Sequence, residues 1–108
     1  MNKLPGTVAS LCYSFDAWLV GSAADPATVE PRDYDIAVPW HNWHPAAQLI
    51  PLDAYPNSFR GWKFLDPRSV DPVEIDVWPC DLGWLMQNDL FKWAYHPRTG
   101  TRIHKEAR

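Results

Sequence analysis

Two aspartates separated by one residue are the part of this sequence best suited to chemistry. Asp33 and Asp35 lie in the segment DYDIAV, where they alternate with Tyr34, Ile36 and Val38. Successive side chains of a β-strand point to opposite faces of the sheet, so both carboxylates are expected on one face. Such a pair can bind one hard divalent cation, and Mg²⁺ or Mn²⁺ is the ion that carboxylate oxygens favour.

A further pair of carboxylates lies in a second alternating segment, residues 73–78, which contains Glu74 and Asp76. Asp76 is expected to complete the metal ligands from a neighbouring strand, and Glu74 to lie on the same face in an outer or solvent-facing role. A divalent cation held by these oxygens can bridge phosphates, neutralise charge during phosphoryl transfer and lower the pKa of an attacking hydroxyl.

The third feature is a turn. The apolar run Ala17–Val20 ends at Gly21 and Ser22, which predicts a buried strand that leaves the sheet through a tight turn. Gly21 would permit close approach of the backbone to a ligand. Ser22 and the neighbouring backbone amides can hold phosphate oxygens.

The elements that must position these residues follow from hydrophobic periodicity. Apolar residues at helical spacing predict a helix over residues 7–16. A second apolar stripe predicts the longest helix over residues 82–94, with Asp81 as its cap and His96-Pro97 as its end. The other expected elements are strands at 17–20, 33–38, 62–65 and 73–78, a short helix in residues 40–50 around PAAQLI and bounded by Pro45 and Pro51, a loop at 23–32 and an edge strand at 99–104.

In these features the chain resembles the minimal nucleotidyltransferases of the DNA polymerase beta superfamily. Their motif is a glycine-serine turn, a D-x-D strand and a third acidic strand, and the resemblance covers about residues 7–104 in element order. It assigns triphosphate positioning to Gly21 and Ser22, and metal binding to Asp33, Asp35 and Asp76. Asp76 would also help to activate the acceptor hydroxyl.

The resemblance implies a fold and an activity. The fold would be a single nucleotidyltransferase-like α+β domain over residues 1–108, sandwich-like, with a small mixed, mostly antiparallel sheet and helices packed on one face. The activity would be metal-dependent transfer of a nucleoside monophosphate, AMP from ATP, to a hydroxyl on a protein, RNA or small molecule. Mg²⁺ or Mn²⁺ would be the cofactor and the nucleoside triphosphate the substrate.

The chain also departs from that family. Many minimal members carry Arg-Gly after the glycine-serine turn and Ser before the D-x-D pair, whereas this chain has Ala24-Asp25-Pro26 and Arg32. The alternative is a catalytically degenerate nucleotidyltransferase-fold protein that acts as a protein-binding module or inhibitor. Its seven tryptophans would then supply the contact surface for a protein partner. A metal-dependent nuclease is a third and weaker possibility.

Composition limits the remaining classes. A hydrophobic fraction of 46% in 108 residues predicts one folded domain. The net charge of -3 does not indicate nucleic-acid binding, although a local basic patch near the C-terminus remains open. Without an apolar run of roughly 20 residues or a signal-peptide pattern, we expect no membrane association and a cytoplasmic location. The two cysteines, Cys12 and Cys80, are expected to be reduced, with Cys12 in the core.

Secondary candidates are basic and imidazole side chains. Lys63 and Arg60 would contact phosphate if their strand lies beside the acidic cluster, and solvent exposure is an equally good expectation. His41 and His44 have the spacing of a zinc ligand pair on a helix, but no third ligand has recognisable spacing to them. Polar surface residues are therefore the favoured interpretation of both histidines.

Overall fold

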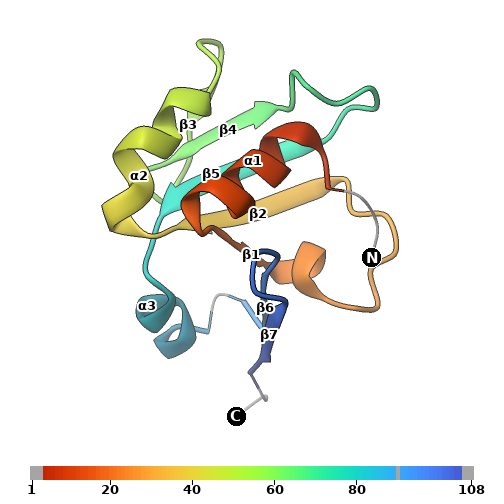
Figure 1. Cartoon of the computed structure of the whole chain (residues 1–108), viewed down its shortest axis with the longest axis vertical. Helices are drawn as coiled ribbons and strands as arrows, with labels where there is room; N and C mark the ends of the chain where they lie inside the picture. Colours follow the sequence, from red (N-terminus) through yellow and green to blue (C-terminus); the bar gives the residue numbers. More distant parts are fainter. Residues whose placement is uncertain (1–3, 90, 106–108) are drawn as a thin grey trace.

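A mixed sheet forms the centre of the molecule (Figure 1). The computed structural model describes residues 4–89 and 91–105, and within them seven strands lie in the order β3-β4-β5-β2-β1-β6-β7. Neighbours β2 and β5 are parallel, and the other neighbouring pairs are antiparallel. The strands are β1 Trp18–Val20, β2 Asp33–Val38, β3 Tyr55–Pro56, β4 Trp62–Leu65, β5 Glu74–Pro79, β6 Trp93–His96 and β7 Thr101–His104.

Short helical segments connect these strands. They are α1 Gly6–Phe15, α2 Trp40–Ala46 and α3 Leu82–Gln87, with 3₁₀ turns at Gly21–Ala24 and Ala47–Leu49. No helix within residues 4–89 and 91–105 has both the length and the apolar character needed to cross a membrane. The expectation of a compact α+β domain with a mixed, mostly antiparallel sheet is confirmed.

One face of the sheet is covered by α1, which lies in front of β2 and β5 in Figure 1, and by α2, which lies at the left of the same view and packs on the same core. Val8, Leu11 and Cys12 of α1 are almost fully buried because they recur on one side of the helix. They pack against Ile36 and Ile75 from the two central strands. Burial raises the pKa of the Cys12 thiol to about 12, which agrees with its expected place in the core.

The opposite face has a separate apolar cluster next to α3. Val20, Ala37, Trp78 and Ala94 point to this face, and Leu85 of α3 packs with them. The helices therefore lie on both faces of the sheet, and the expectation that they pack on one face is wrong. Because α3 has only six residues, it covers only part of this face.

The largest correction concerns the predicted helix over residues 82–94. The helix α3 ends at Gln87, and residues 93–96 form β6 between β1 and β7. Leu90, a member of the predicted stripe, lies outside the described residues. Pairing of Leu19 with Tyr95 and of Val20 with Ala94 gives β1 a second hydrogen-bonded neighbour. This long-range pairing outweighs the local helical periodicity, and aromatic residues also favour strands. The terminal edge strand is confirmed as β7.

A second difference is the place of Pro45. The helix α2 starts at Trp40, where the expected stretch of residues 40–50 begins, but Pro45 lies inside the helix rather than at its boundary. The Trp40 backbone N–H donates to Asp81 Oδ1 at 3.2 Å, so a carboxylate distant in sequence satisfies one of the unpaired donors of this helix end. Asp81 occupies the cap position of α3, as expected, but its side chain does not cap that helix.

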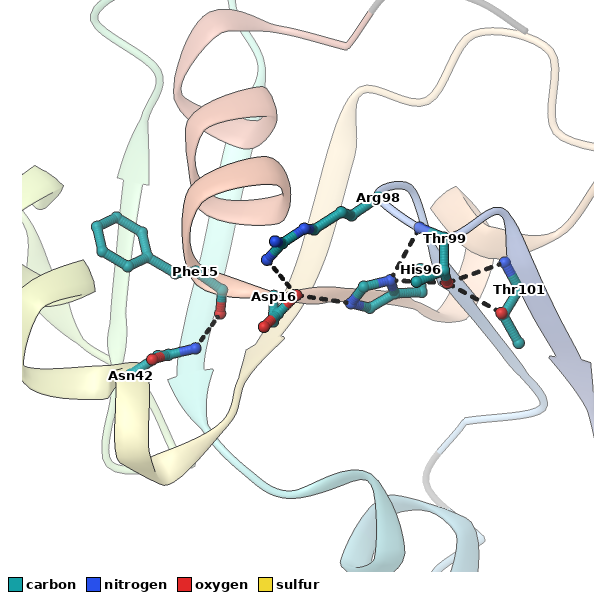
Figure 2. A network of polar contacts seen from close by, with 7 residues as sticks. All are labelled: Phe15, Asp16, Asn42, His96, Arg98, Thr99 and Thr101. Atoms are coloured by element: carbon teal, nitrogen blue, oxygen red, sulfur yellow. Dashed lines mark hydrogen bonds and ion pairs between the residues drawn. The ribbon is translucent and has the colours of Figure 1, made fainter.

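The β6–β7 hairpin is held against the end of α1 by a polar network (Figure 2). Arg98 Nη1 donates to Asp16 Oδ1 at 2.8 Å, and the same oxygen lies 3.7 Å from His96 Nε2. His96 Nδ1 lies 2.9 Å from Thr99 Oγ1 and 3.2 Å from the Thr99 backbone nitrogen, so both ring nitrogens have polar neighbours. Asp16 therefore links the first helix to a hairpin more than 80 residues later in the sequence.

Close approach of two strands fixes Gly61. A Cβ at this position would lie 1.9 Å from the Val77 carbonyl oxygen and 2.6 Å from Trp78 Cα. Both contacts are to backbone, which cannot move aside without breaking the pairing of β4 with β5. The loop that enters β4 is therefore possible only with glycine here.

We expect Gly61→Ala to lower the free energy of unfolding by about 3 kcal/mol or more, because the added methyl overlaps β5. Gly83→Ala is the matched control, since a Cβ there meets no atom within 4 Å and lies in α3. That control should raise stability by about 0.5–1 kcal/mol. Urea unfolding of the two variants measures the difference, and similar stabilities would contradict this account of the loop.

Candidate functional site

Strand register brings the predicted aspartates together. In the parallel pair of β2 and β5, Asp35 lies beside Asp76, and Asp33 lies beside Glu74. These side chains point to the face opposite α1 and α2, because they alternate with Ile36 and Ile75 of the core. They line a small cavity of about 180 Å³, whose walls are Asp33, Tyr34, Asp35, Lys63, Glu74 and Asp76.

The predicted turn meets this cluster from the next strand. Val20 pairs with Asp35, and Gly21 follows with φ 72°, a left-handed conformation that glycine adopts without strain. A Cβ on Gly21 would lie 3.3 Å from Asp35 Oδ2 and 3.1 Å from the Phe91 ring. A side chain at Gly21 would therefore crowd both Asp35 and Phe91, and the backbone of the turn lies close to the carboxylate. Ser22 is exposed in the 3₁₀ turn that follows and does not line the cavity.

Burial and neighbouring like charges both perturb Asp35. Burial, followed by the charges of Asp76 and Asp33, raises the pKa of its carboxyl to about 6, while Lys63 acts in the opposite sense. Near neutral pH the ionised Asp35 therefore lies in an unfavourable environment. A cation beside it would relieve that cost, and cation binding should release a proton when the pH is below about 6.

Lys63 provides part of the compensating charge. Its Nζ lies 3.1 Å from Glu74 Oε1 and 3.9 Å from Asp76 Oδ2. The hydrogen bond and charge of Glu74 raise the pKa of Lys63, and Asp76 adds to this effect. Lys63, one of the secondary candidates, thus lies beside the acids. Arg60 does not line this cavity but belongs to a different pocket.

Sequence reasoning missed Asn57. Its Nδ2 donates to Asp76 Oδ1 and, at 3.2 Å, to the Trp62 carbonyl. Its Oδ1 accepts the backbone N–H groups of Phe59 and Gly61, both at 2.9 Å. The Asn57 side chain thus stabilises the loop that it begins, and it orients the Asp76 carboxylate. The local signal was an asparagine entering a turn, but nothing local indicates a partner 19 residues away.

The carboxylate oxygens of this cluster suit a hard divalent cation. The ionised form of Asp35 is also destabilised by its surroundings, so a bound cation would stabilise it. Within residues 4–89 and 91–105, however, no three Asp, Glu, His or Cys side chains form a group already arranged to hold a metal ion. Lys63 is the positive group beside Glu74 and Asp76 in this structure. His41 and His44, the weaker zinc candidates, are both exposed on α2.

Comparison with known proteins adds no relative to this description. No protein-family model matches the sequence, and searches of the curated proteins and of the solved structures find no match.

We expect Asp35→Asn to be more stable than the wild type by about 1–2 kcal/mol at pH 8, because the substitution removes a half-buried charge that solvent screens only in part. The folded pKa of about 6 exceeds the ordinary value of 3.8, so the wild type loses stability as the pH rises from about 4 through 6. The advantage of the variant should therefore vanish below about pH 4.

Urea unfolding between pH 3.5 and 8 in a chelator measures this difference. Asp53→Asn, an exposed loop substitution, is the control and should follow the wild type within about 0.5 kcal/mol at every pH. An Asp35→Asn variant that is less stable than the wild type at pH 8 would show that the ionised carboxylate is stabilised by its surroundings.

Proposed function

We propose that this protein is a metal-dependent nucleotidyltransferase with a nucleotidyltransferase-like fold, which moves a nucleoside monophosphate, AMP from ATP, to a hydroxyl on a protein, RNA or small molecule. One observation carries the proposal. Gly21 directly follows β1, while Asp35 and Asp76 belong to the next two strands of the sheet, β2 and β5, and the three residues meet on one face. The three parts of the sequence motif are therefore adjacent in space.

The reaction is a displacement at the α-phosphorus. The acceptor oxygen attacks that atom, the bond from the α-phosphorus to the oxygen that bridges to the β-phosphate breaks, and pyrophosphate leaves. The proton of the acceptor hydroxyl passes to Asp76 or to solvent. The protein takes little part in the covalent chemistry. It contributes by positioning the reactants and neutralising charge.

Each residue then has a physical role. The turn at Gly21 and Ser22 would receive the triphosphate, because glycine lets the backbone approach a ligand closely and the exposed Ser22 hydroxyl and adjacent amides can donate to phosphate oxygens. Asp33, Asp35 and Asp76 would hold Mg²⁺ or Mn²⁺. When bound, this ion neutralises phosphate charge and favours the ionised form of the acceptor hydroxyl.

Asp76 is the residue best placed to take the acceptor proton. Asn57 fixes one of its oxygens by a hydrogen bond, while the other lies 3.9 Å from Lys63. The ammonium of Lys63 is within reach of anionic groups at the cavity, so an incoming phosphate can exchange with Glu74 as its partner. Lys63 is then a phosphate ligand and Asn57 a positioning residue.

One observation favours the alternative, a degenerate nucleotidyltransferase-fold protein that binds another protein. Lys63 already supplies positive charge at the acids, as a residue that replaces a lost metal would. In that case substitution of Asp33 and Asp35 would leave function intact, and truncation of exposed tryptophans would abolish partner binding.

We expect isothermal titration to detect ATP binding in the presence of Mg²⁺, and the double variant Asp33→Asn/Asp35→Asn to bind at least tenfold more weakly, because both carboxylates hold the cation. Asp53→Asn is again the matched control and should bind as the wild type does. Transfer of label from ATP labelled at the α-phosphate to protein or RNA in a cell extract should be lost in the same double variant.

These results separate the two candidates. Because Asp35→Asn relieves a charge cost, loss of binding in the double variant would not be explained by unfolding, and circular dichroism checks this directly. A folded wild type that binds neither Mg²⁺ nor any nucleoside triphosphate would contradict the transferase and favour the protein-binding module.

A further inference from the structure

A second and larger cavity lies at the ends of β2 and β5, next to the starts of α2 and α3. Its volume is about 510 Å³, within the range of roughly 300–1,000 Å³ found for small-molecule sites. Six residues define its character: Trp40, Phe59, Arg60, Trp78, Asp81 and Trp84. The acidic cavity does not include any of them.

Aromatic faces dominate the walls. Trp40 and Trp84 are 54% and 48% exposed, although large aromatic side chains are usually covered in a folded domain. Phe59 packs on Trp78 with ring centroids 5.0 Å apart, which makes an apolar floor. A flat ligand that enters this cavity would cover the exposed indoles and stack on aromatic rings.

Polar groups in the same walls can form hydrogen bonds with the edge of such a ligand. Trp78 is only 2% exposed, and its Nε1–H has the Cys80 thiol as a hydrogen-bond partner but no nitrogen or oxygen acceptor among the described residues. Sulfur is a weak acceptor, so a ligand nitrogen or oxygen within reach would be a stronger one. The exposed Arg60 makes no hydrogen bond or ion pair with the described part of the chain, and Asp81 uses one oxygen on Trp40.

Residues of the aromatic cavity lie close to residues of the acidic cluster. Asp76 and Trp78 are alternate residues of β5 on one face, so their Cα atoms lie roughly 7 Å apart. Asn57 bonds Asp76 at one end of the loop that carries Phe59. Phe91 stacks on Trp78 with ring centroids 5.7 Å apart and also borders Gly21. The two cavities are therefore neighbours on this face of the sheet, as the base and phosphate subsites of one nucleotide must be.

We propose that this aromatic cavity is the subsite for the nucleobase of the nucleotide, with stacking on Trp40 and Trp84 and edge contacts to Arg60, Asp81 and the Trp78 N–H. This inference rests on the proposed function, because that function places the phosphates at Gly21 and the acids. A nucleobase fits the walls because it offers two flat faces and an edge of both donors and acceptors. A concave cavity of this size also favours a small ligand over a flat protein surface.

Three probes in isothermal titration separate the two cavities. ATP with Mg²⁺ tests the whole site, adenosine tests the base alone, and inorganic tripolyphosphate with Mg²⁺ tests the phosphates alone. Trp40→Ala and Trp84→Ala should each weaken ATP and adenosine binding about tenfold, because one stacked base is lost, and leave tripolyphosphate binding unchanged. Asp33→Asn/Asp35→Asn should weaken tripolyphosphate and leave adenosine unchanged.

Tyr13→Ala is the matched control, because Tyr13 is an exposed aromatic residue of α1, 50% exposed and remote from both cavities in sequence and lining. It should bind all three probes as the wild type does. Since Trp40 and Trp84 are half exposed, their truncation should leave the fold intact, and thermal unfolding of each variant checks this.

The outcomes distinguish the two proposals. The nucleobase subsite would be overturned if both tryptophan variants bound ATP as tightly as the wild type does. It would also be overturned if the folded wild type did not bind adenosine. Contact with a protein partner would then be the remaining role for these tryptophans. Binding of adenosine that depends on Trp84, without binding of tripolyphosphate, would support the subsite and contradict the proposed transferase.

Discussion

The parallel pairing of β2 with β5 is the constraint on which the rest of the structure depends. It places Asp35 beside Asp76 and Asp33 beside Glu74, so four carboxylates share one small area of the sheet. The other sides of the same strands carry Ile36, Ile75 and Val77, whose burial under α1 and α2 fixes the register. A slip by one residue would turn the acids into the core, so apolar packing on one face enforces charge crowding on the other.

That crowding is offset locally and incompletely. Lys63 contacts two of the carboxylates and Asn57 donates to Asp76. The pKa of Asp35 is nevertheless raised, first by burial and then by the charges of Asp76 and Asp33. Gly21 matters for a related reason, since any side chain there would crowd Asp35 and Phe91. Partly compensated negative charge around a small cavity, beside a glycine turn, is physically suited to a cation and a polyphosphate, and that combination motivates the transferase proposal.

The predictable parts of the fold were those encoded by local alternation. The D-x-D strand matches β2, and the second acidic segment matches β5, because buried and exposed positions alternate along each. The strand β6 was mistaken for helix because its residues continue an apolar stripe at helical spacing, whereas pairing with β1 and β7 decides its conformation. Asn57 and the aromatic cavity were missed for a related reason, since each depends on contacts between loops and strands that no sequence spacing indicates.

If the protein is the proposed transferase, a divalent cation must bind at Asp35 rather than at other acidic residues on the surface. The most direct measurement is a titration of ¹⁵N-labelled protein with substoichiometric Mn²⁺ at pH 7.5, followed by amide signals in two-dimensional NMR. We expect paramagnetic broadening first at Gly21, Asp35 and Asp76, and its loss when the pH falls below about 6, as Asp35 takes up a proton. Broadening spread evenly over acidic loops, or centred on His41 and His44, would contradict a metal site at the junction of β1, β2 and β5.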